Sequence, residues 1–190
     1  MNTETNRIAL ITRLAEKSPQ LGRTALMKFC YFLQIIRRVP LGYSFTLYSY
    51  GPFDADVLSD LDAAEAMGGI TSQIVYYPGG YGYRIAPGSQ TQGAKRWGAD
   101  FLKQHEADLD WVIDEFGAFS SAQLELASTI IYSDREAAIK SESLNRSELS
   151  QRVHDVKPHF SLAQINSLLD TLDSRGFLKS LPAVKRSSMI

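Results

Sequence analysis

The spacing of apolar residues predicts two helices in the first forty positions. Over residues 8–15 apolar side chains recur every three or four positions, which is typical of an amphipathic helix, and Ser18-Pro19 ends it. Residues 23–38 keep the helical spacing but are apolar over most of the circumference. This second helix is therefore expected at the centre of the fold, with Cys30 as a small core residue.

The pattern then changes to that of strands. Residues 43–50 alternate and are rich in aromatic side chains, which favours a short strand. Pro52 followed by acidic residues is typical of a first helical turn, because proline lacks only a donor that is unused there and carboxylates offset the helix dipole. Residues 70–77 and 81–85 flank Pro-Gly-Gly, which predicts a hairpin. The order helix, helix, strand, helix, hairpin is that of a winged helix.

A linker rich in Gly, Ser and Gln leads into a helical second half. Helical spacing recurs over residues 94–116, 121–132, 147–154 and 161–175, with a polar loop at 133–147. The last two helices have the order of a helix-turn-helix. The expected fold class is mainly α with a small β-hairpin, with a winged-helix-like first unit and a helical second unit that also has winged-helix-like order. The expected parts are a winged-helix-like unit at 1–87, the helical unit at 94–180 and a mobile tail at 181–190.

Composition narrows the class of protein. The chain has 190 residues, 44% hydrophobic and 22% charged, and a formal net charge of -1. The balanced charge excludes a strongly basic protein that coats nucleic acid by bulk electrostatics. One cysteine excludes an internal disulfide and a thiolate zinc site. Because no segment has the pattern of a signal peptide or a membrane span, we expect a cytoplasmic protein with no membrane partner.

Candidate catalytic residues are sparse. His154-Asp155 matches the His-Asp pair of metal phosphohydrolases, but a metal site needs three or four converging ligands and no other histidine-rich element accompanies the pair. The sequence has neither a phosphate-binding glycine loop nor a nucleophile elbow, and Gly79-Gly80 indicates a hairpin turn. We therefore expect no catalytic residue, no metal and no cofactor. Three functions are compatible with the sequence: protein binding, DNA binding and catalysis. Phosphoester or nucleotide chemistry at His154-Asp155 is the least favoured of the three.

Charge is unevenly distributed in the first 70 residues. Five acids and no Lys or Arg lie between Gly51 and Ile70, whereas residues 1–50 hold seven Lys and Arg against two acids. The acids either complement a helix dipole on a solvated face or form a contact surface for a partner. A basic patch beside an acidic helix would make a dipolar surface, which suits a charged protein partner better than a DNA duplex.

DNA binding is the alternative function. The acidic helix occupies the place of a recognition helix in a winged helix, where uncompensated carboxylates repel phosphates. The helix at 161–175 offers only Arg175 as a base, against Asp170 and Asp173. A DNA-binding winged-helix transcriptional regulator is therefore possible but not favoured, and dimerisation would combine its weak basic patches.

Three motifs within residues 7–85 together resemble a known family. They are Lys28-x-x-Tyr31 in the second helix, Pro40-Leu41-Gly42, and Tyr50-Gly51-Pro52-Phe53. Their order and spacing resemble those of the SocA-like Panacea antitoxin family, and related segments occur in the carboxyl-terminal parts of macro-domain antitoxins. Phe53 departs from the family pattern, in which a smaller aliphatic residue commonly follows Gly-Pro. Residues 148–178 look like an extension found in only some relatives.

The resemblance implies a non-enzymatic binding protein. It would act as an antitoxin of a toxin-antitoxin system, or as a defence-associated accessory, that neutralises a protein toxin or other effector by direct contact or presents it to a protease. The family motif matches at Lys28, Tyr31, Tyr50, Gly51, Pro52 and Phe53, each of which also has a structural explanation as a core or turn residue. The expected partner-binding residues are these six together with Asp54, Asp56 and Asp60.

The hairpin tyrosines are a further candidate contact surface. They are Tyr76, Tyr77, Tyr81 and Tyr83. Tyrosine gives a large contact area at a low cost in side-chain entropy, although cross-strand packing explains these residues nearly as well. The sequence leaves open the identity of the partner and whether the protein is a monomer or a dimer.

Overall fold

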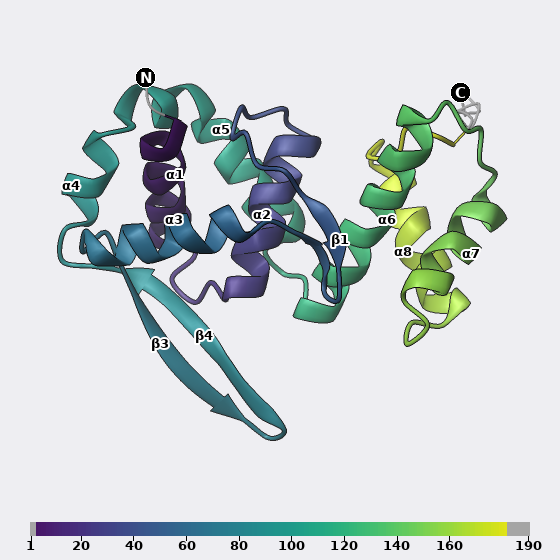
Figure 1. Cartoon of the computed structure of the whole chain (residues 1–190), viewed down its shortest axis with the longest axis horizontal. Helices are drawn as coiled ribbons and strands as arrows, with labels where there is room; N and C mark the ends of the chain where they lie inside the picture. The colour runs from purple at the N-terminus through teal and green to yellow at the C-terminus, as the bar shows by residue number, and fades with distance from the viewer. Residues whose placement is uncertain (1–2, 182–190) are drawn as a thin grey trace, which may run out of the picture. The chain divides into compact units, whose positions relative to one another are not determined.

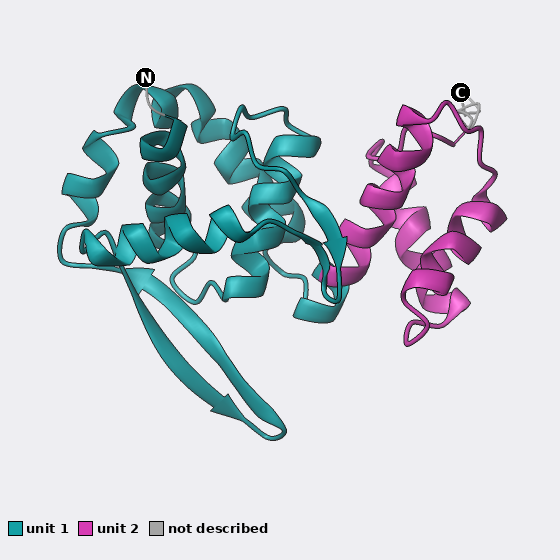
Figure 2. Cartoon of the chain, in the orientation of Figure 1, with its two compact units in different colours: residues 1–124 teal, residues 125–190 magenta. Residues whose placement is uncertain are grey.

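The computed structural model describes residues 3–181 and divides the chain into two compact units, Met1–Leu124 and Glu125–Ile190 (Figure 2). The division falls within helix α6 (Ser121–Ile139). The prediction of a mainly α fold with a small β-hairpin is confirmed, since the chain is mainly helical with small antiparallel strand pairs (Figure 1). Within residues 3–181 no helix is both long and apolar enough to span a membrane.

Unit 1 is built around α2, the helix that the sequence predicts to be central. The helices of this unit are α1 (Thr3–Lys17), α2 (Arg23–Ile35), α3 (Ala55–Ala66), α4 (Thr91–Arg96) and α5 (Ala99–Phe116). Eight consecutive residues of α2, from Leu26 to Leu33, are buried, and Phe32 stacks on Phe116 with ring centroids 4.0 Å apart. Cys30 is a buried free thiol, and burial raises its pKa, so it is the small core residue that the sequence predicts.

The segment between α2 and α3 differs from the prediction. Instead of one strand at 43–50, β1 (Thr46–Tyr48) pairs antiparallel with β2 (Gly51–Phe53), and Gly51 takes a left-handed φ of 85° after the turn. Pro52 lies in β2 opposite Leu47, so the prediction that it starts a helix is wrong. Helix α3 begins at Ala55, where the Asp54 side chain accepts the Asp56 N–H at 2.9 Å.

The predicted hairpin is confirmed. Strand β3 (Ile70–Tyr77) pairs antiparallel with β4 (Gly80–Pro87) across Pro78-Gly79, and Gly79 has a φ of 93°. Ile70 and Ile85 are buried where the hairpin joins the rest of unit 1. Beyond them the two strands project away from the helices (Figure 1).

Helices α4 and α5 belong to unit 1, which therefore extends well beyond the boundary expected at residue 87. Both contact α1, and α5 also contacts α2. A Cβ at Gly98, between α4 and α5, would lie 2.6 Å from that of Ala9, so this close approach to α1 requires glycine. An ion-pair network adds to the packing: Arg13 binds Glu106 at 2.5 Å, and Lys95 binds Glu16 at 2.7 Å.

The network makes the stability of unit 1 depend on pH. The hydrogen bond from Arg13 lowers the pKa of Glu106 from its ordinary 4.5 to about 2. The folded state therefore holds this proton less tightly than the unfolded state, and the stabilisation is present above pH 4.5 and is lost as the pH falls toward 2. Because Glu106 is partly exposed, Glu106→Gln should lower the free energy of unfolding by about 0.5–1 kcal/mol at pH 7 and by less at pH 3.

Urea unfolding at the two pH values measures this difference. Asp114→Asn, which changes an exposed acid on the same helix, is the control and should leave the pH dependence as in the wild type. An equal loss for Glu106→Gln at pH 7 and pH 3 would show that ionisation of Glu106 does not contribute to the pH dependence of stability.

Unit 2 contains the rest of α6 with α7 (Arg146–Val156) and α8 (Leu162–Ser174). The prediction of a polar loop from residue 133 is wrong, because α6 continues to Ile139. Both later helices begin with a capping box, formed by Asn145 with Glu148 in α7 and by Ser161 with Gln164 in α8. Residues 182–190 of the expected mobile tail lie outside the described residues.

Candidate functional site

The residues of the Lys-x-x-Tyr motif lie inside unit 1. Lys28 is 2% exposed and its Nζ donates to the Pro52 carbonyl oxygen at 2.7 Å, which ties α2 to β2. Tyr31 is buried, and its ring meets Phe45 edge-on with centroids 5.2 Å apart. Neither side chain reaches the surface, so as the protein is folded they support the strand pair and do not present a contact surface.

The second family motif divides between core and surface. Gly51 and Pro52 are buried in β2, and Phe53 is half-buried with its ring 5.8 Å from that of Tyr48. Tyr50, in the turn between β1 and β2, is 72% exposed. Tyr50 is therefore the motif residue available to a partner.

Asp60 is the centre of a buried polar cluster. Its carboxylate lies 2.8 Å from Arg7 Nε and accepts the Tyr43 hydroxyl at 2.8 Å, and the Arg7 guanidinium lies over the Tyr43 ring. Burial raises the pKa of Tyr43, so the phenol stays protonated and donates to Asp60. The expectation that Asp60 faces a partner rested on the cost of burying an unpaired acid, and the structure removes that cost by pairing it.

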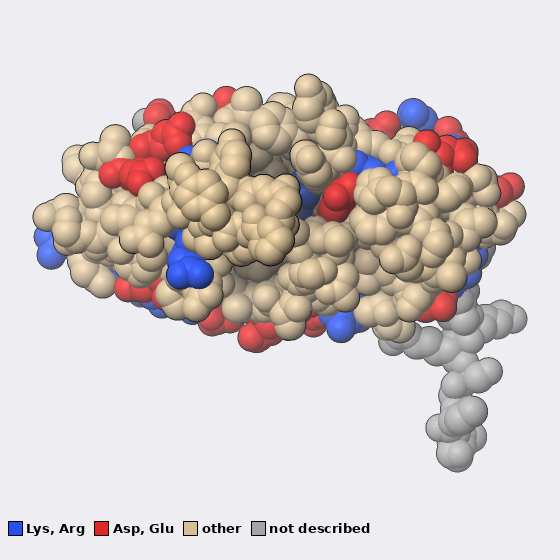
Figure 3. Space-filling model, turned by 90° about the horizontal axis from the view of Figure 1, so that it is seen from below, with Lys and Arg blue, Asp and Glu red and all other residues tan. Residues whose placement is uncertain are grey.

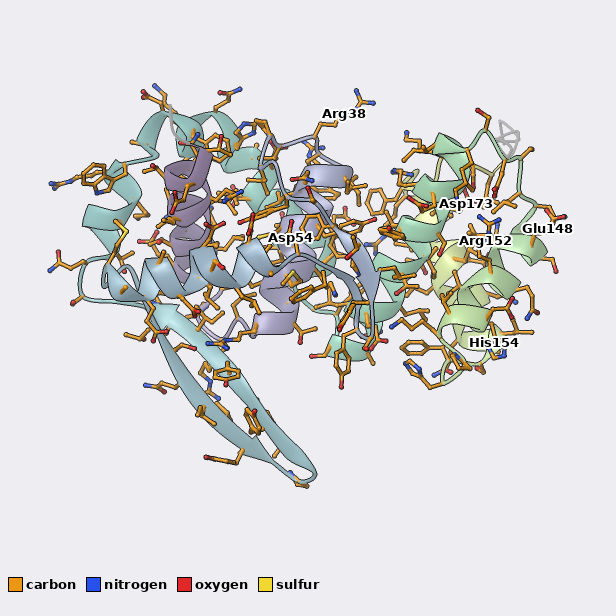
Figure 4. All side chains as sticks on the ribbon, in the orientation of Figure 1. Arg38, Asp54, Glu148, Arg152, His154 and Asp173 are labelled. Carbon is orange, nitrogen blue, oxygen red and sulfur yellow. The ribbon has the colours of Figure 1, made fainter. Side chains whose placement is uncertain are left out.

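The other acids of α3 also have local roles. Asp54 caps the helix and accepts the backbone N–H of Ser44 (Figure 4). Asp62 lies 3.8 Å from Arg23, and Glu65 accepts the Ser72 N–H at 2.8 Å. Asp56 is exposed and contributes only its backbone N–H to the Asp54 cap. Of the three predicted contact acids, Asp56 alone among the described residues remains a free surface charge.

Most cations of the expected basic patch also form ion pairs or hydrogen bonds within unit 1. Cations from residues 3–50 with a partner inside unit 1 are Arg7, Arg13, Lys17, Arg23, Lys28 and Arg37. Arg37, for example, binds Asp108 at 2.7 Å and lies over the Trp111 ring. Arg38, which points away from the ribbon in Figure 4, is the cation of this segment for which the described residues provide no partner. The predicted dipolar surface is therefore not present as free charge.

The hairpin carries several of the exposed large apolar side chains of unit 1, and others are Tyr48, Tyr50, Met67 and Trp97. The cross-strand pairs Ile74↔Tyr83 and Tyr76↔Tyr81 share one face, the face on which Ile70 and Ile85 enter the core. On it Ile74 is 52%, Tyr76 79% and Tyr81 64% exposed. We call Ile74, Tyr76, Tyr81 and Tyr83 the hairpin face. Sequence reasoning identified its tyrosines but missed Ile74, although the two-residue spacing of Ile74 and Tyr76 places them together.

Tyr77 belongs to the opposite side of the hairpin. A Cβ at Gly82 would lie 3.2 Å from the Tyr77 ring, so Tyr77 packs over the glycine across the strands. This contact supports the explanation of Tyr77 by cross-strand packing, whereas Tyr76 and Tyr81 on the hairpin face are 79% and 64% exposed. Arg84 is the only charged residue from 70 to 87. The face of the molecule seen from below, toward which the hairpin projects, is largely uncharged with small separate groups of charge (Figure 3).

A cavity of about 560 Å³ lies beside β4. Its walls come from the α1–α2 connection, the hairpin and the α5–α6 connection, and they include Arg23, Tyr81, Tyr83, Arg84 and Phe119. The Arg23 guanidinium lies 3.7 Å from the centroid of the Tyr83 ring. Sequence reasoning missed this cavity, because it joins segments that lie about 40 to 100 positions apart.

His154 and Asp155, the candidate residues for phosphoester or nucleotide chemistry, are not brought together in a catalytic arrangement. His154 Nδ1 lies 2.9 Å from the Phe160 carbonyl oxygen, and Asp155 accepts from Gln151 at 2.8 Å. In Figure 4 His154 lies at the end of α7 remote from Glu148. Within residues 3–181 no three His, Cys, Asp or Glu side chains are grouped so as to hold a metal ion.

The helix-turn-helix-like end of unit 2 is internally charge-paired. Arg146 of α7 binds both Asp170 and Asp173 of α8, the latter at 3.1 Å. Arg152 pairs with Glu142 at 2.6 Å, and Lys157 with Glu125 at 3.1 Å. Figure 4 labels Arg152 and Asp173 in this part of the chain. Arg146, Arg152 and Lys157 are thus engaged with acids of the same unit.

No family model matches this chain, and no curated protein matches it.

Proposed function

We propose that this chain is a non-enzymatic binding protein that engages a partner protein through the hairpin face. The observation that carries the proposal is the exposure of Ile74, Tyr76 and Tyr81 on one face of a projecting hairpin. Contiguous exposed apolar side chains on a soluble domain mark interaction sites, and tyrosine is enriched among residues that dominate binding energy. The near absence of charge on the hairpin favours a protein surface over a polyanion.

The biological role that fits is that of a cytoplasmic antitoxin or defence-associated accessory. This role rests on the family resemblance of residues 7–85, and the partner would be a protein toxin or other effector. In this proposal the motif residues Lys28, Tyr31, Gly51 and Pro52 hold the strand pair and α3 in place. Contact with the partner then comes from the hairpin face, and Tyr50, although 72% exposed, lies outside it.

Capture of the partner from the source cells tests the proposal. The tagged protein is recovered with and without nuclease, and bound proteins are quantified by mass spectrometry. The double variant Tyr76→Ser/Tyr81→Ser should reduce recovery of the principal partner at least about tenfold, because buried aromatic anchors contribute about 2 kcal/mol or more each to binding. Co-expression with the recovered partner then shows whether its toxicity is neutralised.

Tyr50→Ser is the matched control, since it removes an equally exposed tyrosine from another turn of unit 1. Recovery unchanged in Tyr50→Ser and lost in the double variant supports the hairpin face. The opposite result would assign contact to the motif turn. Recovery of DNA alone, or loss of all binding after nuclease, would favour the transcriptional regulator.

A further inference from the structure

The outer edge of β4 has unpaired backbone groups. In an antiparallel pair, alternate residues direct their N–H and C=O groups toward the partner strand and away from it. Ile85 donates its N–H outward to the Leu21 carbonyl oxygen at 2.8 Å, and Ser72 of β3 donates outward to Glu65. The same alternation directs the backbone groups of Tyr83 and Tyr81 outward. Neither residue has a backbone hydrogen bond on that side to any described residue.

Leu21 occupies the position of a third strand, but only for one residue. It forms an isolated antiparallel bridge with Ile85, after which the chain turns into α2 at Arg23. A Cβ at Gly22 would lie 3.4 Å from the Tyr83 carbonyl oxygen, so the open part of the third-strand position begins at the Tyr83 N–H and continues past Tyr81. It adjoins the cavity of about 560 Å³, which Tyr81 and Tyr83 help to line. An unpaired edge beside an open cavity is the arrangement in which proteins accept an added strand.

The charged residues around this edge indicate which kind of segment would bind there. Arg23 and Arg84 line the cavity, and none of its described lining residues is Asp or Glu. Arg84 has no ion pair among residues 3–181, and Arg23 forms a long ion pair with Asp62, at 3.8 Å. The register places Arg84 on the opposite face of the hairpin from Tyr83, whose ring Arg23 covers. Carboxylates on the two faces of an added strand would therefore each meet a guanidinium group.

We propose that the outer edge of β4 receives an extended segment of the partner protein as an added strand, with acidic side chains of that segment held by Arg84 on one face and by Arg23 on the other. This inference rests on the proposed function and specifies how the partner is recognised. Main-chain hydrogen bonds to Tyr81 and Tyr83 supply affinity, and the arginines supply specificity. The hairpin face remains available to the body of the same partner.

Other occupants match the edge less well. A second copy of this chain pairing through its own β4 would place Arg84 against a strand that holds no acid, since residues 80–87 contain none. A nucleic acid has no regular row of N–H donors for the outward carbonyl groups of Tyr81 and Tyr83. An acidic peptide strand satisfies both the backbone groups and the charges.

Selection of peptides on the intact protein tests the proposal. A phage library of random nine-residue peptides is selected on the wild type after depletion on Tyr81→Pro. Proline at position 81 removes an outward N–H but no hydrogen bond to β3, so the hairpin register is retained. The enriched sequence is then synthesised, and its affinity is measured by fluorescence anisotropy. We expect enriched peptides that alternate β-favouring residues and contain Asp or Glu.

Three matched comparisons separate edge pairing from loss of a side chain. Tyr81→Pro should weaken binding of the synthetic peptide about tenfold or more, and Tyr81→Ser, which keeps the N–H, should weaken it less. Tyr76→Pro removes the outward N–H from the opposite edge of the same cross-strand pair and should leave affinity within about threefold of the wild type. Arg84→Glu should abolish binding of the acidic peptide, whereas Arg96→Glu, at an exposed position outside the cavity, should not.

Circular dichroism and thermal melts verify that each variant is folded. The proposal is overturned if no acidic peptide is enriched, if the peptide binds Tyr81→Pro as well as the wild type, or if a 12-nucleotide single-stranded DNA displaces it with the same dependence on Arg84. Its failure is distinct from failure of the proposed function. A cellular partner lost from Tyr76→Ser/Tyr81→Ser but retained by Tyr81→Pro would leave the hairpin face as the binding site and exclude strand addition.

Discussion

Replacing Asp60 by alanine is expected to lower the free energy of unfolding by about 3–5 kcal/mol, because it removes one partner of a buried ion pair. The change would leave the Arg7 guanidinium uncompensated and the Tyr43 hydroxyl without its acceptor, both of which now meet Asp60 at 2.8 Å. Urea unfolding followed by tryptophan fluorescence measures the effect. Both tryptophans, Trp97 and Trp111, lie in unit 1 and report on the unit that contains Asp60.

Asp56→Ala is the matched control. Asp56 belongs to the same helix and is exposed, so its loss should change the free energy of unfolding by no more than about 0.5 kcal/mol. Asp60→Asn keeps an acceptor for Tyr43 and should fall between the two. Equal stabilities for Asp60→Ala and Asp56→Ala would contradict the buried cluster.

This prediction governs how binding variants are chosen. Charge reversal at Asp54, Asp56 and Asp60 together would remove a helix cap and a buried acid, so loss of partner binding in such a variant would report unfolding. Asp56→Lys alone, or changes on the hairpin face, probe the surface without disturbing the core.

Local pattern was sufficient to predict most of the elements. The helical spacing of residues 8–15 and 23–38 predicted α1 and α2, because burial of one face imposes a 3.6-residue period. Pro-Gly-Gly predicted the hairpin, since Gly79 needs a positive φ. The apolar character of α2 also predicted its central position and the burial of Cys30.

Pairing between distant segments was not predictable from the pattern. Arg7 and Asp60 are 53 positions apart, and Arg13 and Glu106 are 93 apart, yet each pair meets. Counted along the chain, these residues look like a basic patch and an acidic helix. The fold brings opposite charges together, so the apparent surface dipole becomes internal ion pairs. The same limitation placed the end of the first unit at residue 87, because contacts of α4 and α5 with α1 are long-range.

Pro52 shows how one signal can have two structural outcomes. Gly-Pro followed by acids resembles a helix start, but the chain keeps Pro52 in β2, where an edge strand tolerates the missing donor. Asp54, two residues later, supplies the cap. Lys28 donates to the Pro52 carbonyl oxygen and so joins α2 to β2, a contact that cannot be predicted from local spacing.

For the hairpin face, too, the local sequence pattern does not predict which side chains are covered by the rest of the fold. Period-two alternation identifies which tyrosines share a face, but it does not show whether that face meets the core. Near the base it does, through Ile70 and Ile85, and farther out the same face extends beyond the helices. Folding alone does not require the strands to stay apolar beyond the core. We infer that partner binding is the reason for these apolar residues.

Replacing Asp134 by alanine is expected to lower the free energy of unfolding of unit 2 by about 3 kcal/mol or more. Asp134 is fully buried in α6, and its carboxylate accepts the backbone N–H groups of Lys179 and Ser180 and the Ser180 hydroxyl at 2.8–2.9 Å. It also pairs with Arg135, which donates to the Phe177 carbonyl oxygen at 2.8 Å. Alanine would leave several buried or half-buried donors without an acceptor, and each such loss costs about 1–3 kcal/mol.

Hydrogen exchange identifies where the stability is lost. The amides of Lys179 and Ser180 should exchange far faster in Asp134→Ala, because their acceptor is gone, and Asp134→Asn should protect them partly through its remaining carbonyl oxygen. Asp170→Ala, which removes an exposed acid of α8, is the control and should leave both amides protected. Unchanged exchange at Lys179 and Ser180 in Asp134→Ala would show that the segment after α8 is held by the packing of Phe177 alone.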